Sequence, residues 1–437
     1  MEVQNSKIYE SVVAGWAVAT MGCAALFSWN AVITASSYYS KMFCGSPLHR
    51  SYESIFSITY QTTSLLGTVY AARVTEEMSA EKRIIPRLRS LAVLFGGLTV
   101  LACVPSAPRD WVFTPATLVG VAACGALSQA LGSALYGIAA AMPPAFVSWN
   151  MAGQAVGGLV PAAIVVATDL ATPMSNDDDC GEKDVDPAAV GYFAAASALF
   201  VIAEAAFRVL DRTAVFRQYV VEPARKRARR SEESSAAPLV AADSKPHDEW
   251  RTIAHLAHLC SVPAAAVFVI FAVTLATFPT LTALARAAHH ADDDDGDGSR
   301  FRELFVPLLF LEFNLFDFFG RSAAPLFKPL TLRPKALLVA SCLRVFFVPL
   351  VALGTLAGGR YNHLKSSAIL RASPAPFVLM APFALTNGLV ATLAMGAGRP
   401  LVHEDHHELA GNILSFFLTF GLTVGSALSF PLLALVS

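Results

Sequence analysis

Long apolar blocks constrain this chain more than any other feature of its sequence. Eleven stretches of about 20 or more residues carry almost no charge, and a helix of about 20 residues matches the hydrocarbon thickness of a bilayer. We therefore predict an all-α polytopic membrane protein with eleven transmembrane helices. The predicted helices cover residues 11–38, 54–75, 86–105, 112–140, 144–168, 188–210, 252–285, 301–323, 335–357, 374–398 and 408–436.

Composition and charge exclude several other classes of protein. Only 15% of the residues are charged, whereas about 25% are charged in an average soluble domain. The net charge of −1 supplies no basic field for nucleic acid. No phosphate-binding loop of the type G-x-x-x-x-G-K-[ST] is present, which argues against transport driven by ATP. The start of the chain, MEVQNSKIYE, is too polar for a signal peptide, so we expect the first apolar block to be retained.

The basic residues of the loops predict the orientation of the chain. If the N-terminus is cytoplasmic, the inside loops hold 19 Lys and Arg residues and the outside loops hold 10. Such an excess on the inside is typical of membrane proteins. The acidic runs 177–179 and 292–295 then lie outside. An odd number of helices places the C-terminus on the extracellular side.

A polar segment over residues 211–251 divides the chain. It contains the basic run RKRARR and is expected to be disordered. We predict an N-terminal six-helix bundle over residues 1–210 and a C-terminal five-helix bundle over residues 252–437. Two bundles around a site at the membrane midplane are typical of secondary transporters.

Polar groups inside the apolar blocks are the first candidates for function, because a charge at mid-membrane costs roughly 2.5–3.5 kcal/mol. The eighth block carries Asn314, Asp317 and Arg321 at positions i, i+3 and i+7 of one helical face. The carboxylate and the guanidinium can neutralise each other, and they can also bind a polar ligand. The phenylalanines around them favour a ligand pocket, although an ion pair that only joins two helices fits the same spacing.

Other positions in the apolar blocks fit a structural role, a role in ligand binding, or both. Trp29 and Asn30 in the first block fit an interfacial belt, or a bundle interior where the indole stacks on a planar ring. Gln129 stands among small residues of the fourth block, whose usual role is close helix packing. Gly153 and Gly157 have the small-xxx-small spacing of such contacts.

Charged residues in other blocks also need partners. Glu204 and Arg208 stand one helical turn apart, which predicts a local pair. Arg344 in the ninth block requires a buried partner that spacing does not identify. Glu312 is a candidate proton carrier.

A zinc-protease pattern, H-E-x-x-H, occurs at His403–His407. It falls in a short loop before the last apolar block instead of on one helix face. We therefore predict no metal site, no cofactor and no enzymatic activity. Cys44 and Cys180 fall outside in the predicted topology, where a disulfide and two free thiols both fit.

The motif FNLFDFFGR of the eighth block resembles the signature of the equilibrative nucleoside transporter family. Four further stretches resemble that family in the same order: MGCAALFSWNAVITASSYY, YGIAAAMPPAFVSWNMAGQAVGG, LRVFFVP, and NGLVATLAMG with AGNILSFFLTFGLTVGS. The resemblance spans almost the whole chain. It implies a fold like that of the major facilitator superfamily and movement of nucleosides, and sometimes nucleobases, by alternating access. Members of the family either equilibrate their substrates or couple them to protons, so the mode of coupling stays open.

The resemblance also implies roles for individual residues. Asp317 and Arg321 are expected to hold the sugar hydroxyls or a base edge, and Trp29 and Asn30 to lie beside the ligand. Further implied roles are the pocket lining at Leu26 and Leu422, the outer gate at Ile33, Pro279, Phe310 and Asn314, the inner-gate ion pair of Arg87 with Glu408, and the fifth-helix packing positions Gly153 and Gly158.

The sequence departs from the family pattern at two points. Ser28 stands where the family usually has proline, and Gly132 stands where an ungapped count places the pocket glutamine. Gln129, three residues earlier, is our candidate for that role. We expect a monomer in the plasma membrane, with a nucleoside or nucleobase substrate and protons as the further partner. The alternative function is transport of another small solute, such as an organic cation, on the same scaffold.

Overall fold

Every regular element in the described part of the computed structural model is helical. The structure describes residues 2–44, 46, 52–74, 78–103, 110–171, 185–235, 245–279, 281–282, 299–356 and 375–436. Each of the eleven apolar blocks overlaps at least one of these helices. The all-helical class predicted from the sequence is therefore confirmed.

In the described part of the first half, seven helices precede the central segment. They are α1 (Glu2–Thr34), α2 (Ser36–Met42), α3 (Tyr52–Val74), α4 (Ala80–Ala102), α5 (Asp110–Ala141), α6 (Ala145–Ala171) and α7 (Pro187–Arg212). The central segment adds α8 (Ala214–Phe216), the π-helical turn η1 (Arg217–Val221), α9 (Glu222–Ser235) and α10 (Lys245–Leu259).

The second half begins with α11 (Ser261–Thr277) and continues with α-helices and short 3-10 helices. These are α13 (Ser299–Ala323), η3 (Ala324–Leu332), α14 (Pro334–Leu343), η4 (Arg344–Phe346), α15 (Phe347–Leu356), α17 (Ala375–Gly396), η6 (Arg399–Leu401), η7 (Glu404–His406) and α18 (His407–Val436).

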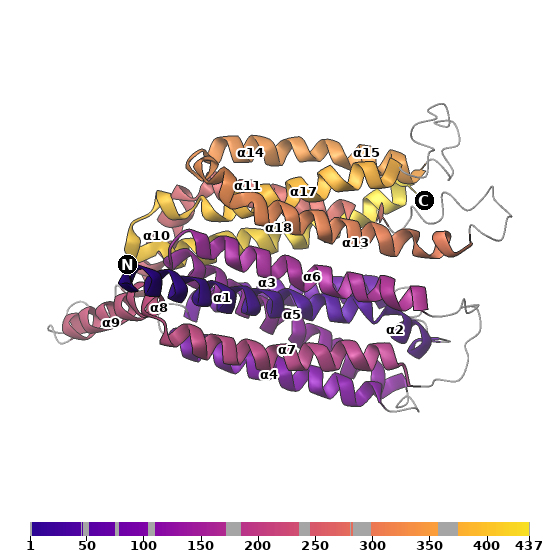
Figure 1. Ribbon diagram of the computed structural model, residues 1–437, viewed down its shortest axis with the longest axis horizontal. Helices are drawn as coiled ribbons and strands as arrows, with labels where there is room; N and C mark the ends of the chain where they lie inside the picture. Colours follow the sequence, from indigo (N-terminus) through magenta and orange to yellow (C-terminus); the bar gives the residue numbers. More distant parts are fainter. Residues whose placement is uncertain are drawn as a thin grey trace.

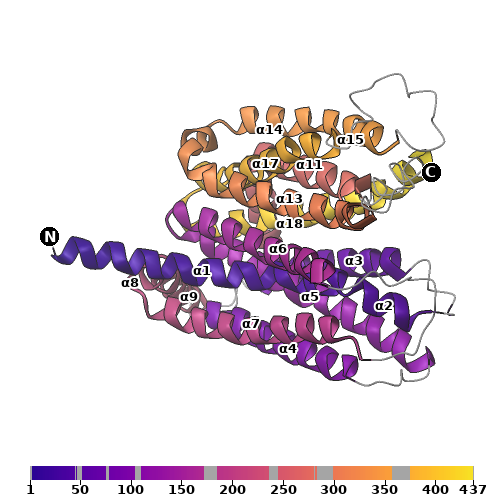
Figure 2. The same cartoon turned by 45° about the vertical axis from the view of Figure 1, so that its right-hand side comes forward.

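The long helices run side by side in two groups (Figures 1 and 2). In one group α1 packs on α6 and α7, α3 on α5, and α4 on α7; in the other α11 packs on α18 and α14, and α13 on α17. The groups meet where α6 contacts α13 and where α18 contacts α5 and α3. Helix α1 begins at the end where α9 lies, and α18 ends at the opposite end (Figure 1).

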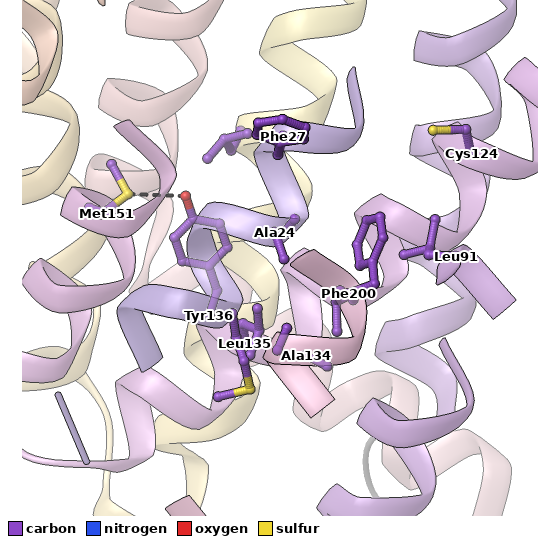
Figure 3. Packing of buried hydrophobic residues seen from close by; sticks show 14 of the residues in the cluster. Ala24, Phe27, Leu91, Cys124, Ala134, Leu135, Tyr136, Met151 and Phe200 are labelled. Carbon is purple, nitrogen blue, oxygen red and sulfur yellow. Dashed lines mark hydrogen bonds between the residues drawn. The ribbon is translucent and has the colours of Figure 1, made fainter. Parts of the chain in front are cut away.

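Small residues and aromatic rings build the interior of the first group. At Gly153 of α6, an added Cβ would overlap the backbone carbonyl of Ala19 on α1, so only glycine permits this approach. Figure 3 shows Tyr136 and Met151 meeting in the same core, with Phe27 nearby. The predicted role of Gly153 in helix packing agrees with this geometry.

Large apolar side chains remain exposed along the outer faces of the helices. Val93 on α4, Val119 on α5 and Val378 on α17 are 76%, 68% and 68% exposed. Soluble monomers rarely expose apolar surface on this scale. A lipid environment accounts for these faces.

The described residues contain eight helices that are long and apolar enough to cross a membrane, or nine if the bent pair α10–α11 counts as one span. Helices α3 and α13 fall outside this set. Helix α3 is rich in serine and threonine, and α13 carries Glu312, Asp317 and Arg321. The count of eleven spans therefore stays a prediction.

The structure corrects three predictions, which concern the start of the first helix, the disorder of the central segment and the continuity of the seventh apolar block. Helix α1 begins at Glu2, well before residue 11. Most of the segment 211–251 is helical instead of disordered, because its run of Glu, Ala, Arg and Lys favours a helix over 222–235. The block 252–285 is interrupted, since α10 and α11 meet at an angle of 73°.

Candidate functional site

An ion pair is buried near the C-terminal end of α13. Nε of Arg321 lies 2.7 Å from Oδ2 of Asp317, and the two residues are 5% and 4% exposed. Both residues belong to one helix at spacing i, i+4, so the helix itself sets this geometry. The pair predicted from the eighth apolar block therefore forms.

Helix α17 supplies a second partner for the carboxylate. Nδ2 of Asn387 donates to Oδ1 of Asp317 over 2.7 Å. The next residue, Gly388, lets the helices approach so closely that an added Cβ would overlap the backbone oxygen of Asp317. The absence of a side chain at residue 388 thus places the amide of residue 387 against the carboxylate.

Arg344 is the buried centre of a wider network. It is 2% exposed, and its guanidinium donates to the carbonyl of Phe383 and to Oγ1 of Thr386, at 2.7 and 2.6 Å. A further N–H group donates to Oγ1 of Thr274 at 2.9 Å and to Oδ1 of Asn387 at 3.3 Å. The partner that spacing did not identify is therefore a set of neutral oxygens.

The orientation of the Asn387 amide follows from this network. Its oxygen accepts from Thr274 at 2.7 Å as well as from Arg344. Because both donors approach the oxygen, the nitrogen has to face Asp317. A continuous chain of hydrogen bonds thus links Arg344 through Asn387 to the Asp317–Arg321 pair.

The same ion pair touches the first group of helices. Nη1 of Arg321 donates to the carbonyl of Met151 on α6 over 3.3 Å. Beside it, the hydroxyl of Tyr136 on α5 donates to Gln154 at 2.8 Å. Charged and polar groups from both groups of helices therefore meet at one level of the bundle.

Most of the residues predicted for the ligand and the outer gate lie on α1 and α13. Trp29 packs on Tyr60 of α3 with ring centroids 4.4 Å apart. Asn30 donates to the carbonyl of Leu26 at 3.1 Å. Near this level Asn314 bonds the carbonyl of Phe310 at 2.8 Å, and the ring of Phe310 lies 4.8 Å from that of Phe278.

Gly158 connects these helices. A Cβ at this position would overlap Oδ1 of Asn314 on α13 and would lie 3.9 Å from Nδ2 of Asn30 on α1. The glycine thus lies between two residues of the predicted site, in addition to packing helices. The remaining predicted residues, Leu26, Ile33 and Pro279, are half-buried.

Gln129 of α5 contacts the second group of helices through α18. Its amide nitrogen donates to Oγ1 of Thr419 on α18 over 2.6 Å, and Thr68 lies 3.3 Å from the same hydroxyl. Its amide oxygen lies 3.9 Å from the point that a Cβ on Gly132 would occupy. Leu422, one turn beyond Thr419, is half-buried and packs against the core.

The predicted ion pair of Arg87 with Glu408 does not form. Oε1 of Glu408 lies 2.5 Å from Nη2 of Arg83, which stands one turn before Arg87 on α4. Arg87 lies 6.0 Å over the ring of Tyr70 instead. The i, i+4 spacing puts both arginines on one face, and the position of α18 decides which of them meets Glu408.

Two further predictions concern charged residues outside this site. Glu204 pairs with Arg208 at 2.7 Å, as predicted, and also with Arg89 at 2.8 Å. Glu312 is half-buried, and its Oε2 has no hydrogen-bond partner among the described residues.

The structure bears on the predicted cysteine pair and on the H-E-x-x-H pattern. Cys44 is disulfide-bonded, but Cys180 lies outside the described residues. The H-E-x-x-H pattern is split between η7 and α18, and the described residues contain no group of His, Cys, Asp and Glu that could hold a metal ion.

Sequence reasoning missed Asn387, Thr274, Met151 and Arg83. Asn387 has a sequence signal, since it is a polar residue followed by glycine in an apolar block. Arg83 shares a helix face with Arg87. Met151 contributes a backbone carbonyl, which no pattern of side chains can mark.

Comparison with known proteins identifies relatives and a fold. The family described as "Nucleoside transporter" matches residues 116–434. Equilibrative nucleoside transporter 1 of Mus musculus is 26% identical, covering 95% of this chain and 96% of the relative. Equilibrative nucleoside transporter 2 of Homo sapiens is 24% identical with the same coverage.

A solved structure shows the same architecture. The proton:xylose symporter XylE of the major facilitator superfamily, bound to 6-bromo-6-deoxy-D-glucose, aligns with a TM-score of 0.59. The alignment covers 98% of this chain and 89% of XylE at 13% identity, which establishes the fold alone. With its membrane helices and transporter relatives, the chain is an integral membrane transporter and not an enzyme; it belongs to the nucleoside transporter family.

Proposed function

We propose that the protein carries nucleosides, and also nucleobases, across the membrane by alternating access at the Asp317–Arg321 site. The observation that carries the proposal is the buried ion pair, which belongs to the second group of helices and bonds Met151 of the first. A carboxylate accepts hydrogen bonds and a guanidinium donates them. Sugar hydroxyls and base edges offer both kinds of partner.

The apolar and aromatic residues around the pair give the site its shape. In this proposal Trp29 packs on the ligand, Leu26 and Leu422 line the pocket, and Asn30 contributes an amide. Gln129 substitutes for the glutamine that the family pattern places at Gly132, which agrees with its amide oxygen lying 3.9 Å from the Cβ position of that glycine.

Gating follows from contacts between the two groups of helices. Asn314 and Phe310 of α13, with Ile33 and Pro279, form the outer gate, and Gly158 lets α6 approach Asn314. Glu408 and Arg83 form the inner gate. Because Arg321 holds the Met151 carbonyl at 3.3 Å, rocking of the groups would break this bond and re-form it.

The membrane arrangement in this proposal has eleven spans, a cytoplasmic N-terminus, an extracellular C-terminus, and a disulfide between Cys44 and Cys180. The two ends of the helical chain lie at opposite ends of the bundle (Figure 1), as an odd number of spans requires. We place the protein in the plasma membrane as a monomer. Transport is then driven by the substrate gradient, or by a proton gradient if a carboxylate such as Glu312 carries the coupled proton.

The organic-cation alternative has less support. Asp317 already holds Arg321 and Asn387 through its two oxygens, each at 2.7 Å. A cationic ligand would have to displace Arg321, or would meet its positive charge. Competition of a monoamine with a nucleoside for uptake tests the alternative directly.

Uptake measurements test the proposed function. Cells expressing the protein receive labelled adenosine, inosine, uridine or hypoxanthine, with Asp317→Asn and Arg321→Lys beside the wild type. Uptake should fall at least ~10-fold in both variants, since each removes part of a buried charge-assisted pair. Glu204→Gln, a carboxylate variant on α7, is the matched control. Normal uptake by both site variants at normal surface expression would disprove the site.

A further inference from the structure

Two arginines flank one carboxylate where α4 and α18 begin, and a third arginine stands one helical turn away on α4. Arg83 and Arg87 lie on α4, Arg227 lies on α9, and Glu408 is the second residue of α18. Nη2 of Arg83 lies 2.5 Å from Oε1 of Glu408, and Nη2 of Arg227 lies 3.8 Å from Oε2. We call these four residues the gate cluster.

The charges of the gate cluster do not balance. Arg83 is 3% and Arg87 8% exposed, and a guanidinium keeps its proton in proteins. Glu408 neutralises one of the three positive charges. Among the side chains that the structure describes, no other carboxylate lies within ion-pair distance of these arginines, which leaves a surplus of two positive charges, with Arg83 and Arg87 buried and Arg227 partly exposed.

Hydrogen-bond donors in the cluster are also unpartnered. Nε and Nη1 of Arg83, Nη1 of Arg87 and Nε of Arg227 are buried and have no hydrogen-bond partner among the described residues. Buried donors normally have partners, because leaving one without an acceptor is costly. The described structure therefore has several N–H groups, from three guanidinium groups, that lack an acceptor.

We propose that the gate cluster binds a phosphate-type oxyanion beside Glu408. A phosphate group offers several acceptor oxygens and a charge of about −1.5 to −2, which matches the surplus of the cluster. The planar fork of arginine fits phosphate oxygens in pairs. Chloride has neither the charge nor the spread of acceptors that these donors require.

The bound anion would join three parts of the protein. Helix α4 belongs to the first group of helices, α18 to the second, and α9 to the segment between them. An anion held by Arg83, Arg87 and Arg227 would therefore strengthen the connection of α4 with α18 at Arg83 and Glu408, and it would hold α9 against both helices. This inference depends on the charge of the cluster and not on the transported solute.

Thermal unfolding of the purified full-length protein in an uncharged detergent tests the proposal. Inorganic phosphate is titrated at constant ionic strength against chloride. We expect a saturable rise of Tm in the wild type. Arg87→Gln and Arg227→Gln should each need ~10-fold or more phosphate for the same rise, because each loses a charge-assisted contact.

Arg225→Gln is the matched control, since Arg225 is an exposed arginine of the same helix α9. It removes an equal charge and should respond like the wild type. Arg227 lies on a partly exposed helix, so its variant keeps the test decisive even if the buried Arg87 variant does not fold. Equal and saturable stabilisation of Arg225→Gln and Arg227→Gln by phosphate would overturn the proposal.

A second arm distinguishes a free phosphate from a lipid headgroup. The protein is reconstituted into phosphatidylcholine vesicles with and without phosphatidic acid, and its unfolding is compared. Stabilisation by phosphatidic acid that requires Arg227 but not Arg225, with no response to free phosphate, assigns the site to a headgroup. No Arg227-dependent response in either arm refutes the site.

Discussion

Asn387 on α17 donates to Oδ1 of Asp317 over 2.7 Å, while Arg321 holds the other oxygen of the same carboxylate. The carboxylate is therefore positioned by a second helix as well as by its own. The amide in turn is oriented by Thr274 and Arg344. The ion pair of the proposed site thus depends on residues that do not belong to the eighth apolar block.

Replacement of Asn387 by leucine should weaken substrate transport without loss of the protein. The variant leaves Oδ1 of Asp317 without this buried donor, at a cost of roughly 1–3 kcal/mol. The measurement is the KM of nucleoside uptake, which we expect to rise at least several-fold. Thr392→Val on the same helix, where the hydroxyl bonds the Gly388 carbonyl, should leave KM near the wild-type value.

Arg344→Lys should act through Asn387. Lysine keeps the charge but lacks the planar fork that reaches Phe383, Thr386 and Asn387 together. Uptake should fall by roughly 10-fold. In a double-mutant cycle with Asn387→Leu the two effects should be non-additive by about 0.5–3 kcal/mol. Strict additivity would contradict the chain of hydrogen bonds that we describe.

A charge exchange should show which arginine closes the inner gate. Arg83→Glu alone removes a buried pair, which typically costs ~3–5 kcal/mol, so both Tm and uptake should fall. Combining it with Glu408→Arg should restore part of both. The control is the corresponding exchange of Arg87 with Glu408. If that exchange restored Tm and uptake better than the exchange at Arg83, the result would favour a pair of Arg87 with Glu408.

Gly153→Ala should destabilise the protein, because the new Cβ overlaps the carbonyl of Ala19 where α6 crosses α1. Gly97→Ala on α4 meets nothing within 4 Å. That change should raise stability by up to ~1 kcal/mol through helix propensity. Thermal unfolding of the two purified variants measures the difference. A fall of Tm for Gly97→Ala as large as that for Gly153→Ala would disprove the packing argument.

Local patterns predicted several elements well. The apolar blocks indicated helices, and the i, i+4 spacing predicted the pairs of Asp317 with Arg321 and of Glu204 with Arg208. Both pairs lie within a single helix, where periodicity alone decides proximity. The polar composition of the segment 211–251 predicts disorder, whereas residues 222–235 form a helix because Glu, Ala, Arg and Lys favour one.

The sequence by itself determined that this chain enters a membrane, that its helices form two sets around a polar segment, and that one helix carries a neutralised ion pair. Only the tertiary structure decided that Asn387, Thr274 and Arg344 support that pair, and that Arg83 meets Glu408 in place of Arg87. The physical reason is that helical spacing shows which residues share a face. It does not show which face meets which neighbour, or at what height along the bundle.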